Sequence, residues 1–125
     1  MSEIFLYNLS PEKEIKVKML CRKMLIGARA IEKEEYGYTL GCLLGLTTDA
    51  TVRDGEDFDE EMLYISGLNG GMLNVFLDQL RRKKLGVQLK AIQTDTNIGF
   101  TSRELYLELC AEREAFKKGI QAHKE

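Results

Sequence analysis

Short apolar segments alternate with capped helical segments along this chain, and this alternation constrains the fold more than any other feature. Residues 3–8 read as a strand, and Ser10-Pro11-Glu12 then gives a serine cap, a proline at the first helical position and an acid in the first turn. The helix should run to about Leu25. The order then recurs, with a strand at residues 62–66 and a helix over residues 70–84.

Each of these helices leads into a further strand and a further helix. Residues 28–35 and 87–94 are the next strand candidates. A short helix is predicted over residues 38–46, and a longer one begins at Thr101, where Glu104 completes a capping box. Strands that alternate with helices predict right-handed βαβ crossovers and an α/β structure. We therefore expect two βαβα halves that form a four-stranded mixed or parallel sheet with packed helices.

The length and the break between the halves predict the domain organisation. The chain has 125 residues, which suits a single domain covering residues 1–125. Its halves are residues 1–46 and 62–120. They are joined by an acidic linker at residues 47–61, which holds seven acids, one arginine and no periodic pattern.

The two halves show the outline of an internal repeat. Ala30-Ile31 aligns with Ala91-Ile92 at an offset of 61 residues, and Ile4 aligns with Met62 at an offset of 58. A three-residue insertion in the second half reconciles the two offsets. Both a duplication and a chance similarity of two βαβα segments account for this pattern.

Composition narrows the classes of function. A net charge of −2 argues against a nucleic-acid partner, and no apolar run is long enough to span a membrane. The N-terminus lacks the features of a signal peptide, so we expect a cytoplasmic protein. Three widely spaced cysteines and a single histidine, His123 in a polar C-terminal tail expected to fray, predict neither a metal site nor a disulfide framework. We expect no cofactor.

The polar run after the fourth strand is the candidate site. Thr94, Asp95, Thr96 and Asn97 follow a buried strand, and Lys90 lies four residues before Thr94 on that strand. Ligands of α/β sheets bind outside the carboxyl ends of strands, so these five residues are our candidate ligand-binding residues. The alternative is a turn, because these side chains hydrogen-bond their own backbone. No catalytic residue is assigned.

Four other patterns have simpler interpretations. The turn 66-SGLNGG-71 lacks the glycine and lysine spacing of a nucleotide site, so it predicts a capped tight turn. The acids of residues 54–59 lack the ligand order of a calcium loop, so they predict a solvated loop. Residues 81–84 carry four cations at a helix end, which is typical of a solvated terminus. Each cysteine lies in an apolar stretch and should be a reduced, small hydrophobe.

The second half also carries a set of residues that points to a family. The set is Ser66-Gly67, Leu80-Arg81, Leu89-Lys90-Ala91, Thr94-Asp95-Thr96-Asn97, Glu104-Leu105 and Glu108-Leu109, with Glu35-Tyr36-Gly37 and Gly41-Cys42-Leu43-Leu44-Gly45 in the first half. It resembles a bacterial family, domain of unknown function 3783. Asp95 and Phe100 stand where that family has proline and tryptophan. The resemblance implies no activity.

Three hypotheses of function follow. The first is a non-enzymatic small-molecule-binding or regulatory module that forms a homo-oligomer. The second is a protein-interaction or scaffold subunit that uses an apolar face, such as Leu107 or the second face of the first helix, at Ile15 and Met19. The third is a small-metabolite enzyme that uses Lys90, Asp95 and Asn97.

Overall fold

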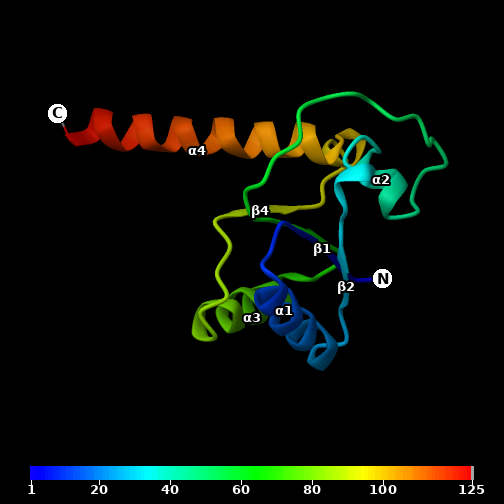
Figure 1. Ribbon diagram of the computed structural model, residues 1–125. Coiled ribbons are helices and arrows are strands. Elements are labelled where there is room, and N and C mark those ends of the chain that lie inside the picture. The colour runs from blue at the N-terminus through cyan, green and yellow to red at the C-terminus, as the bar shows by residue number, and fades with distance from the viewer. Residues whose placement is uncertain (125) are drawn as a thin grey trace. The chain divides into compact units, whose positions relative to one another are not determined.

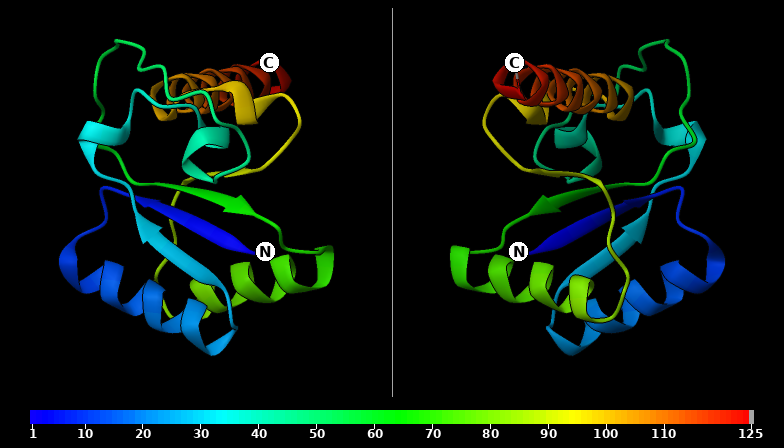
Figure 2. Two further views of the ribbon diagram at one scale, coloured as in Figure 1. Left: turned by 90° about the vertical axis from the view of Figure 1, so that its right-hand side faces the viewer. Right: turned by 90° about the vertical axis from the view of Figure 1, so that its left-hand side faces the viewer.

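The computed structural model describes the backbone of residues 1–124 and the side chains of residues 1–119 (Figures 1 and 2). The lone histidine, His123, therefore has its side chain outside the described residues. The chain forms two compact units. Unit 1 comprises Met1–Lys33 and Asp59–Thr94, and unit 2 comprises Glu34–Phe58 and Asp95–Glu125. Both units draw on both halves of the sequence.

Unit 1 contains a four-stranded mixed sheet. The strands are β1 (Glu3–Tyr7), β2 (Gly27–Ala30), β3 (Met62–Ser66) and β4 (Leu89–Ile92). Their order is β2-β1-β3-β4, with β1 parallel to β2, β3 parallel to β4, and β1 antiparallel to β3. Two βαβ crossovers thus meet at a central antiparallel pair, which confirms the predicted α/β fold and its sheet of four strands.

The two long helices of unit 1 cover one face of this sheet. They are α1 (Pro11–Lys23) and α3 (Gly70–Arg82), and Figure 2 shows both on the same side of the strands. The predicted caps are confirmed, because the side chain of Ser10 accepts from the Lys13 N–H and that of Asn69 accepts from the Met72 N–H. Each cap satisfies a backbone donor that the first helical turn leaves unpaired.

Alternating side chains divide the sheet residues between its two faces. Ile4, Leu6, Leu63 and Ile65 point toward the helices and join the main hydrophobic core. The core also contains α1, α3 and connecting residues: Val17, Leu20, Cys21, Ile26, Phe76, Leu80, Leu85 and Val87. Burial raises the pKa of the Cys21 thiol to about 11, so Cys21 behaves as the small hydrophobe that was predicted.

The two βαβ segments have matching dimensions. Each consists of a strand of five residues, a helix of 13 residues and a strand of four residues. The first strand and the helix recur 59 residues later, and the final strand recurs 62 residues later. The predicted insertion of three residues is therefore present, although both predicted offsets were one residue too small. That error matters because a shift of one residue moves a strand side chain to the opposite face.

The turns that flank the helices also correspond. Asn8 follows β1 with φ 59°, and Gly67 follows β3 with φ 78°. Leu25 follows α1 with φ 59°, and Lys84 follows α3 with φ 58°. At the end of the first helix Leu25 takes the left-handed conformation, and Gly27 opens β2. These matches are compatible with an internal repeat.

Unit 2 contains α2 (Leu40–Leu43), α4 (Ser102–Lys124) and a 3-10 turn at Asn97–Gly99. A second 3-10 turn, at Lys33–Glu35, begins at the last residue of the first segment of unit 1. At the start of α4 the predicted capping box is confirmed. The Thr101 N–H donates to the Glu104 carboxylate at 3.0 Å, and the Glu104 N–H donates to the Thr101 hydroxyl at 3.1 Å. Glu104 therefore satisfies the donor that precedes the helix, and Thr101 satisfies one inside it.

The acidic segment at residues 47–61 has no helix or strand, but its part up to Phe58 is anchored within unit 2. Phe58 is only 4 % exposed, and its ring stacks on Tyr36 at 4.8 Å and on Tyr106 at 4.3 Å between centroids. The Arg103 guanidinium donates to one oxygen of Asp57 at 2.6 and 3.0 Å. A plain solvated loop would make none of these contacts, so that interpretation was incomplete.

Candidate ligand-binding site

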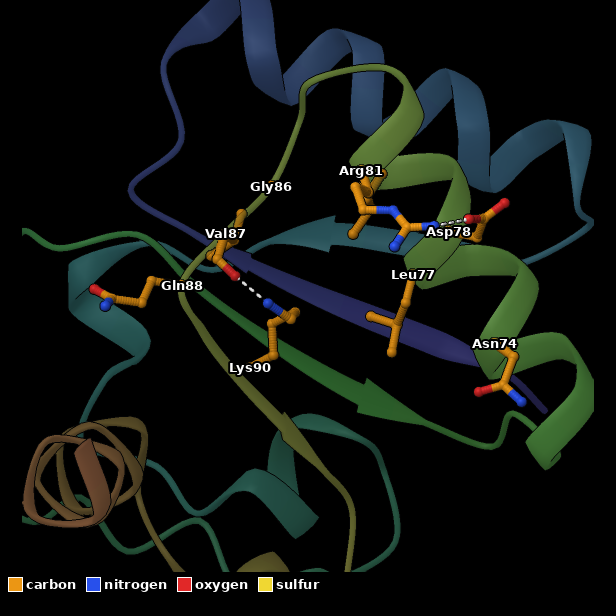
Figure 3. A pocket seen from close by; sticks show the side chains of 9 residues that line it. Asn74, Leu77, Asp78, Arg81, Gly86, Val87, Gln88 and Lys90 are labelled. Atoms are coloured by element: carbon orange, nitrogen blue, oxygen red, sulfur yellow. Dashed lines mark hydrogen bonds and ion pairs between the residues drawn. The ribbon is translucent and has the colours of Figure 1, made fainter. Parts of the chain in front are cut away.

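A pocket of about 840 Å³ opens between the end of α3 and the edge strand β4, and we call it the α3–β4 pocket. Figure 3 shows Leu77 on α3 at one side of it, with Lys90 on β4 and Val87 on the connecting chain at the other side. All of the residues that line it belong to unit 1, and they are Asn74, Leu77, Asp78, Leu80, Arg81, Gly86, Val87, Gln88 and Lys90.

The three-residue insertion of the second βαβ segment builds this pocket. After α3 the chain reverses at Lys84, and the Leu85 N–H donates to the Leu80 carbonyl at 2.8 Å. In the first segment the equivalent residue, Ile26, is followed directly by strand β2. In the second segment residues 86–88 intervene, and all three line the pocket. The pocket therefore lies where the two halves differ in length.

Lys90 supplies the cation of the pocket. Its register partner on β3 is Leu63, so its side chain lies on the helix-covered face of the sheet. The ammonium group donates to the carbonyl of Val87, as Figure 3 shows. Partial burial lowers the pKa of Lys90, because desolvation disfavours the charged form. An ammonium group has three donors, so two remain for a ligand or for water.

The rim of the pocket carries an ion-pair cluster on α3. The Asp78 carboxylate accepts from Arg81 at 2.5 Å and from Arg82 at 2.7 Å. The hydrogen bond from Arg81 is the main cause that lowers the pKa of Asp78. Both arginines are exposed, which agrees with a solvated helix end, but Arg81 also lines the pocket.

The predicted polar run ends the strand and leads into unit 2. The Gln93 N–H donates to the Ile65 carbonyl at 2.8 Å, one residue before Thr94. Thr94, Asp95 and Thr96 are exposed, and Asn97 opens a 3-10 turn that the Phe100 N–H closes at 3.0 Å. None of these four residues lines the α3–β4 pocket. Of the five predicted site residues, the structure places Lys90 alone there.

Sequence reasoning did not single out Leu77, Val87 or Gln88 as pocket residues. Leu77 fell within the helix predicted over residues 70–84, and Val87 at the start of the strand candidate at residues 87–94. The insertion was the one signal in the sequence that could have located them, because inserted residues lie outside the repeated framework. The insertion can be placed between α3 and β4 only with the correct offsets, which are 59 residues for the helices and 62 residues for the final strands.

Two further predictions concern turns and metals. At Gly67 a Cβ atom would lie 2.4 Å from the Met1 carbonyl oxygen, and Asn69 caps α3, so residues 66–71 form the capped tight turn that was predicted. Among the described residues, no three His, Cys, Asp or Glu side chains lie close enough together to hold a metal ion. Within the same residues, no helix combines the length and apolar character needed to cross a membrane.

Comparison with known proteins gave one match. No curated protein and no solved structure matches the chain. Residues 61–116, which contain β3, α3, β4 and the first part of α4, match the model of a family described as Domain of unknown function (DUF3783). The match does not extend to the first-half residues 35–45 that also carried the resemblance. It thus supports the resemblance of the second half to this domain of unknown function.

Proposed function

We propose that this protein is a non-enzymatic binding module whose α3–β4 pocket takes a small molecule with an apolar body and one anionic group. The observation that carries the proposal is the partly desolvated Lys90 ammonium beside an apolar wall. Of the five residues expected from the sequence to bind a ligand, Lys90 is the one that this proposal keeps.

The size and lining of the pocket favour a ligand of metabolite size. Its volume of about 840 Å³ falls in the range of small-molecule sites. Leu77, Leu80 and Val87 offer apolar contacts, and the amide side chains of Asn74 and Gln88 offer a few polar ones. Apolar walls with a small number of polar groups are the usual composition of such sites.

The charge of the pocket favours an anion. Arg81 is already paired with Asp78, whereas Lys90, the other cation that lines the pocket, forms no ion pair with a described carboxylate and donates to the Val87 carbonyl. An anionic group near Lys90 would favour its charged form and offset the desolvation that lowers its pKa. A medium-chain monocarboxylate such as octanoate has both the apolar body and the single charge.

Isothermal titration calorimetry with octanoate tests the proposal. The wild type should bind with a defined stoichiometry, and Lys90→Met should bind at least about tenfold more weakly, since a charge-assisted hydrogen bond contributes about 1.5–3 kcal/mol. Lys83→Met is the matched control, because Lys83 is exposed and does not line the pocket. Equal affinity in all three proteins would exclude the site.

A protein-interaction role is the second candidate, and exposed apolar side chains favour it. Ile15 and Met19 are 58 % and 56 % exposed on α1, and Leu107 is 66 % exposed on α4. Self-association through such a surface would give the homo-oligomer expected from the sequence. Sedimentation velocity over a range of concentrations tests it, and a constant monomer mass would argue against it.

A further inference from the structure

The first βαβ segment has a second pocket at the place that corresponds to the α3–β4 pocket. It has a volume of about 500 Å³ and lies beside the end of α1 and the start of β2, and we call it the α1–β2 pocket. Its lining residues are Lys18, Arg22, Leu25, Ile26, Gly27 and Ala28, all of which belong to unit 1.

The backbone around the two pockets has the same geometry. The Leu25 N–H donates to the Arg22 carbonyl at 3.1 Å, and the Lys84 N–H donates to the Arg81 carbonyl at 3.1 Å. The next residue in each segment, Ile26 or Leu85, is buried and donates five residues back at 2.8 Å. Arg22 and Arg81 are therefore equivalent, and each lines the pocket of its own segment.

The two pockets differ in size because only the second segment has the insertion. Without residues that correspond to 86–88, the α1–β2 pocket lacks the apolar wall that Val87 provides. Its strand residues are Gly27, which has no side chain, and Ala28, which has only a methyl group, so the strand backbone borders the pocket. A compact polar ligand suits this pocket better than a molecule with an apolar body.

The charges of the α1–β2 pocket are both positive. Lys18 is paired with Glu14 at 3.3 Å on the outer surface of α1. Arg22 forms no ion pair within the part of the chain that the structure describes, because Met19 stands at the position equivalent to Asp78. Asp78 neutralises the guanidinium of Arg81 in the second segment, whereas the equivalent guanidinium of Arg22 is available to a ligand in the first.

The strand edge adds a backbone donor. The Gly27 N–H donates to Ser2, just before β1, at 3.1 Å, and the Ile31 N–H donates to Leu6 of β1 at 2.9 Å. Alternate residues of a parallel strand direct their N–H groups to opposite sides. The Ala28 N–H therefore points away from β1, toward the open edge of the sheet. A guanidinium, an ammonium and a backbone N–H are the donors that phosphate groups use in proteins.

We infer that the α1–β2 pocket is a second binding site, which takes a small phosphate-like anion through Arg22 and the Ala28 N–H, with the Glu14-paired Lys18 adding positive charge at its rim. The second βαβ segment would bind an amphipathic anion, and the first would bind a compact one. The two sites lie on opposite edge strands of one sheet, so each can be tested without the other.

Nitrogen-15 NMR titration of the full chain with inorganic phosphate, at constant ionic strength, tests this inference. The amide signals of Gly27 and Ala28 should shift and saturate in the millimolar range. Arg22→Gln should weaken the binding at least fivefold, and Lys23→Gln should leave it unchanged, because Lys23 is the exposed neighbour that does not line the pocket. The folded state of each variant is visible in the same spectra.

Two results would overturn the inference. One is a linear, unsaturated response to phosphate, and the other is an equal loss of affinity in Arg22→Gln and Lys23→Gln, which would show nonspecific attraction to the cationic end of α1. An octanoate titration of the same sample reports on Gln88 and Lys90 instead. Failure of octanoate with success of phosphate would reject the proposed function alone, and the reverse would reject the second site alone.

Discussion

Deletion of residues 86–88 should remove the α3–β4 pocket and leave the sheet of unit 1 folded. The deletion joins Leu85 to Leu89, which gives the second βαβ segment the connection that Ile26 and Gly27 make in the first. Because that connection already links a helix of 13 residues to a strand of four, no strain should follow.

The expected cost in stability follows from the contacts that the deletion removes. Val87 is 2 % exposed in the core, and burial of such a side chain contributes about 1.5–3 kcal/mol. The Gly86 carbonyl accepts a hydrogen bond from Lys13 at 2.8 Å, which contributes about 1 kcal/mol. A shorter loop regains less than about 1 kcal/mol. The net loss should be about 2–3 kcal/mol, within the 5–15 kcal/mol typical of a domain.

Urea unfolding followed by circular dichroism measures this loss, and octanoate calorimetry measures the loss of the pocket. Val87→Ala is the control, because it keeps the chain length and should account for much of the cost by itself. Loss of cooperative unfolding in the deletion variant would refute the equivalence of the two segments. Undiminished octanoate affinity would refute the position of the site.

Three further predictions address other parts of the chain. Lys90→Met should make the unliganded protein as stable as the wild type or slightly more stable, because desolvation lowers the pKa of Lys90. The gain in unfolding free energy, measured by urea unfolding, should be present below the folded-state pKa of Lys90 and vanish above the ordinary lysine pKa. Phe58→Ala should cost about 3–5 kcal/mol in the same assay, since its buried ring stacks on two tyrosines, whereas the exposed Val52→Ala should change stability by less than about 0.5 kcal/mol. The pKa of Glu104 is lowered, chiefly by the hydrogen bond from the Thr101 backbone. The contribution of Glu104 to folding stability is therefore present above the ordinary glutamate pKa and is lost as the pH falls through its folded-state pKa. An acid titration of Tm should be flatter for Glu104→Gln than for the wild type, and identical titrations would exclude this role.

Much of the fold could be predicted because its signals are local. The caps at Ser10 and Asn69 and the capping box at Thr101 each depend on side chains within three residues of the backbone groups that they bind. The strands and helices follow from periodicity for the same reason. The strand order could not be derived, because the sequence of a single strand does not specify which other strand pairs with it.

The prediction of the site was less complete because its parts come together only in the folded chain. Lys90 was selected together with Thr94–Asn97, but the insertion at residues 86–88 and the end of α3 provide its neighbours in the pocket. The burial of Phe58 was missed for a similar reason, since Tyr36 and Tyr106 lie 22 and 48 residues away in sequence. Because the residues around Phe58 are polar, its burial between two tyrosines could not be predicted from the local sequence.

The most direct test of the central proposal is a nitrogen-15 NMR titration of the wild type and of Lys90→Met with octanoate. We predict saturable shifts at Leu77, Gln88 and residue 90 in the wild type, and a loss of those shifts in the variant. Shifts that centre on Thr94–Asn97, or no saturable shift in either protein, would contradict the assignment of the α3–β4 pocket as the binding site.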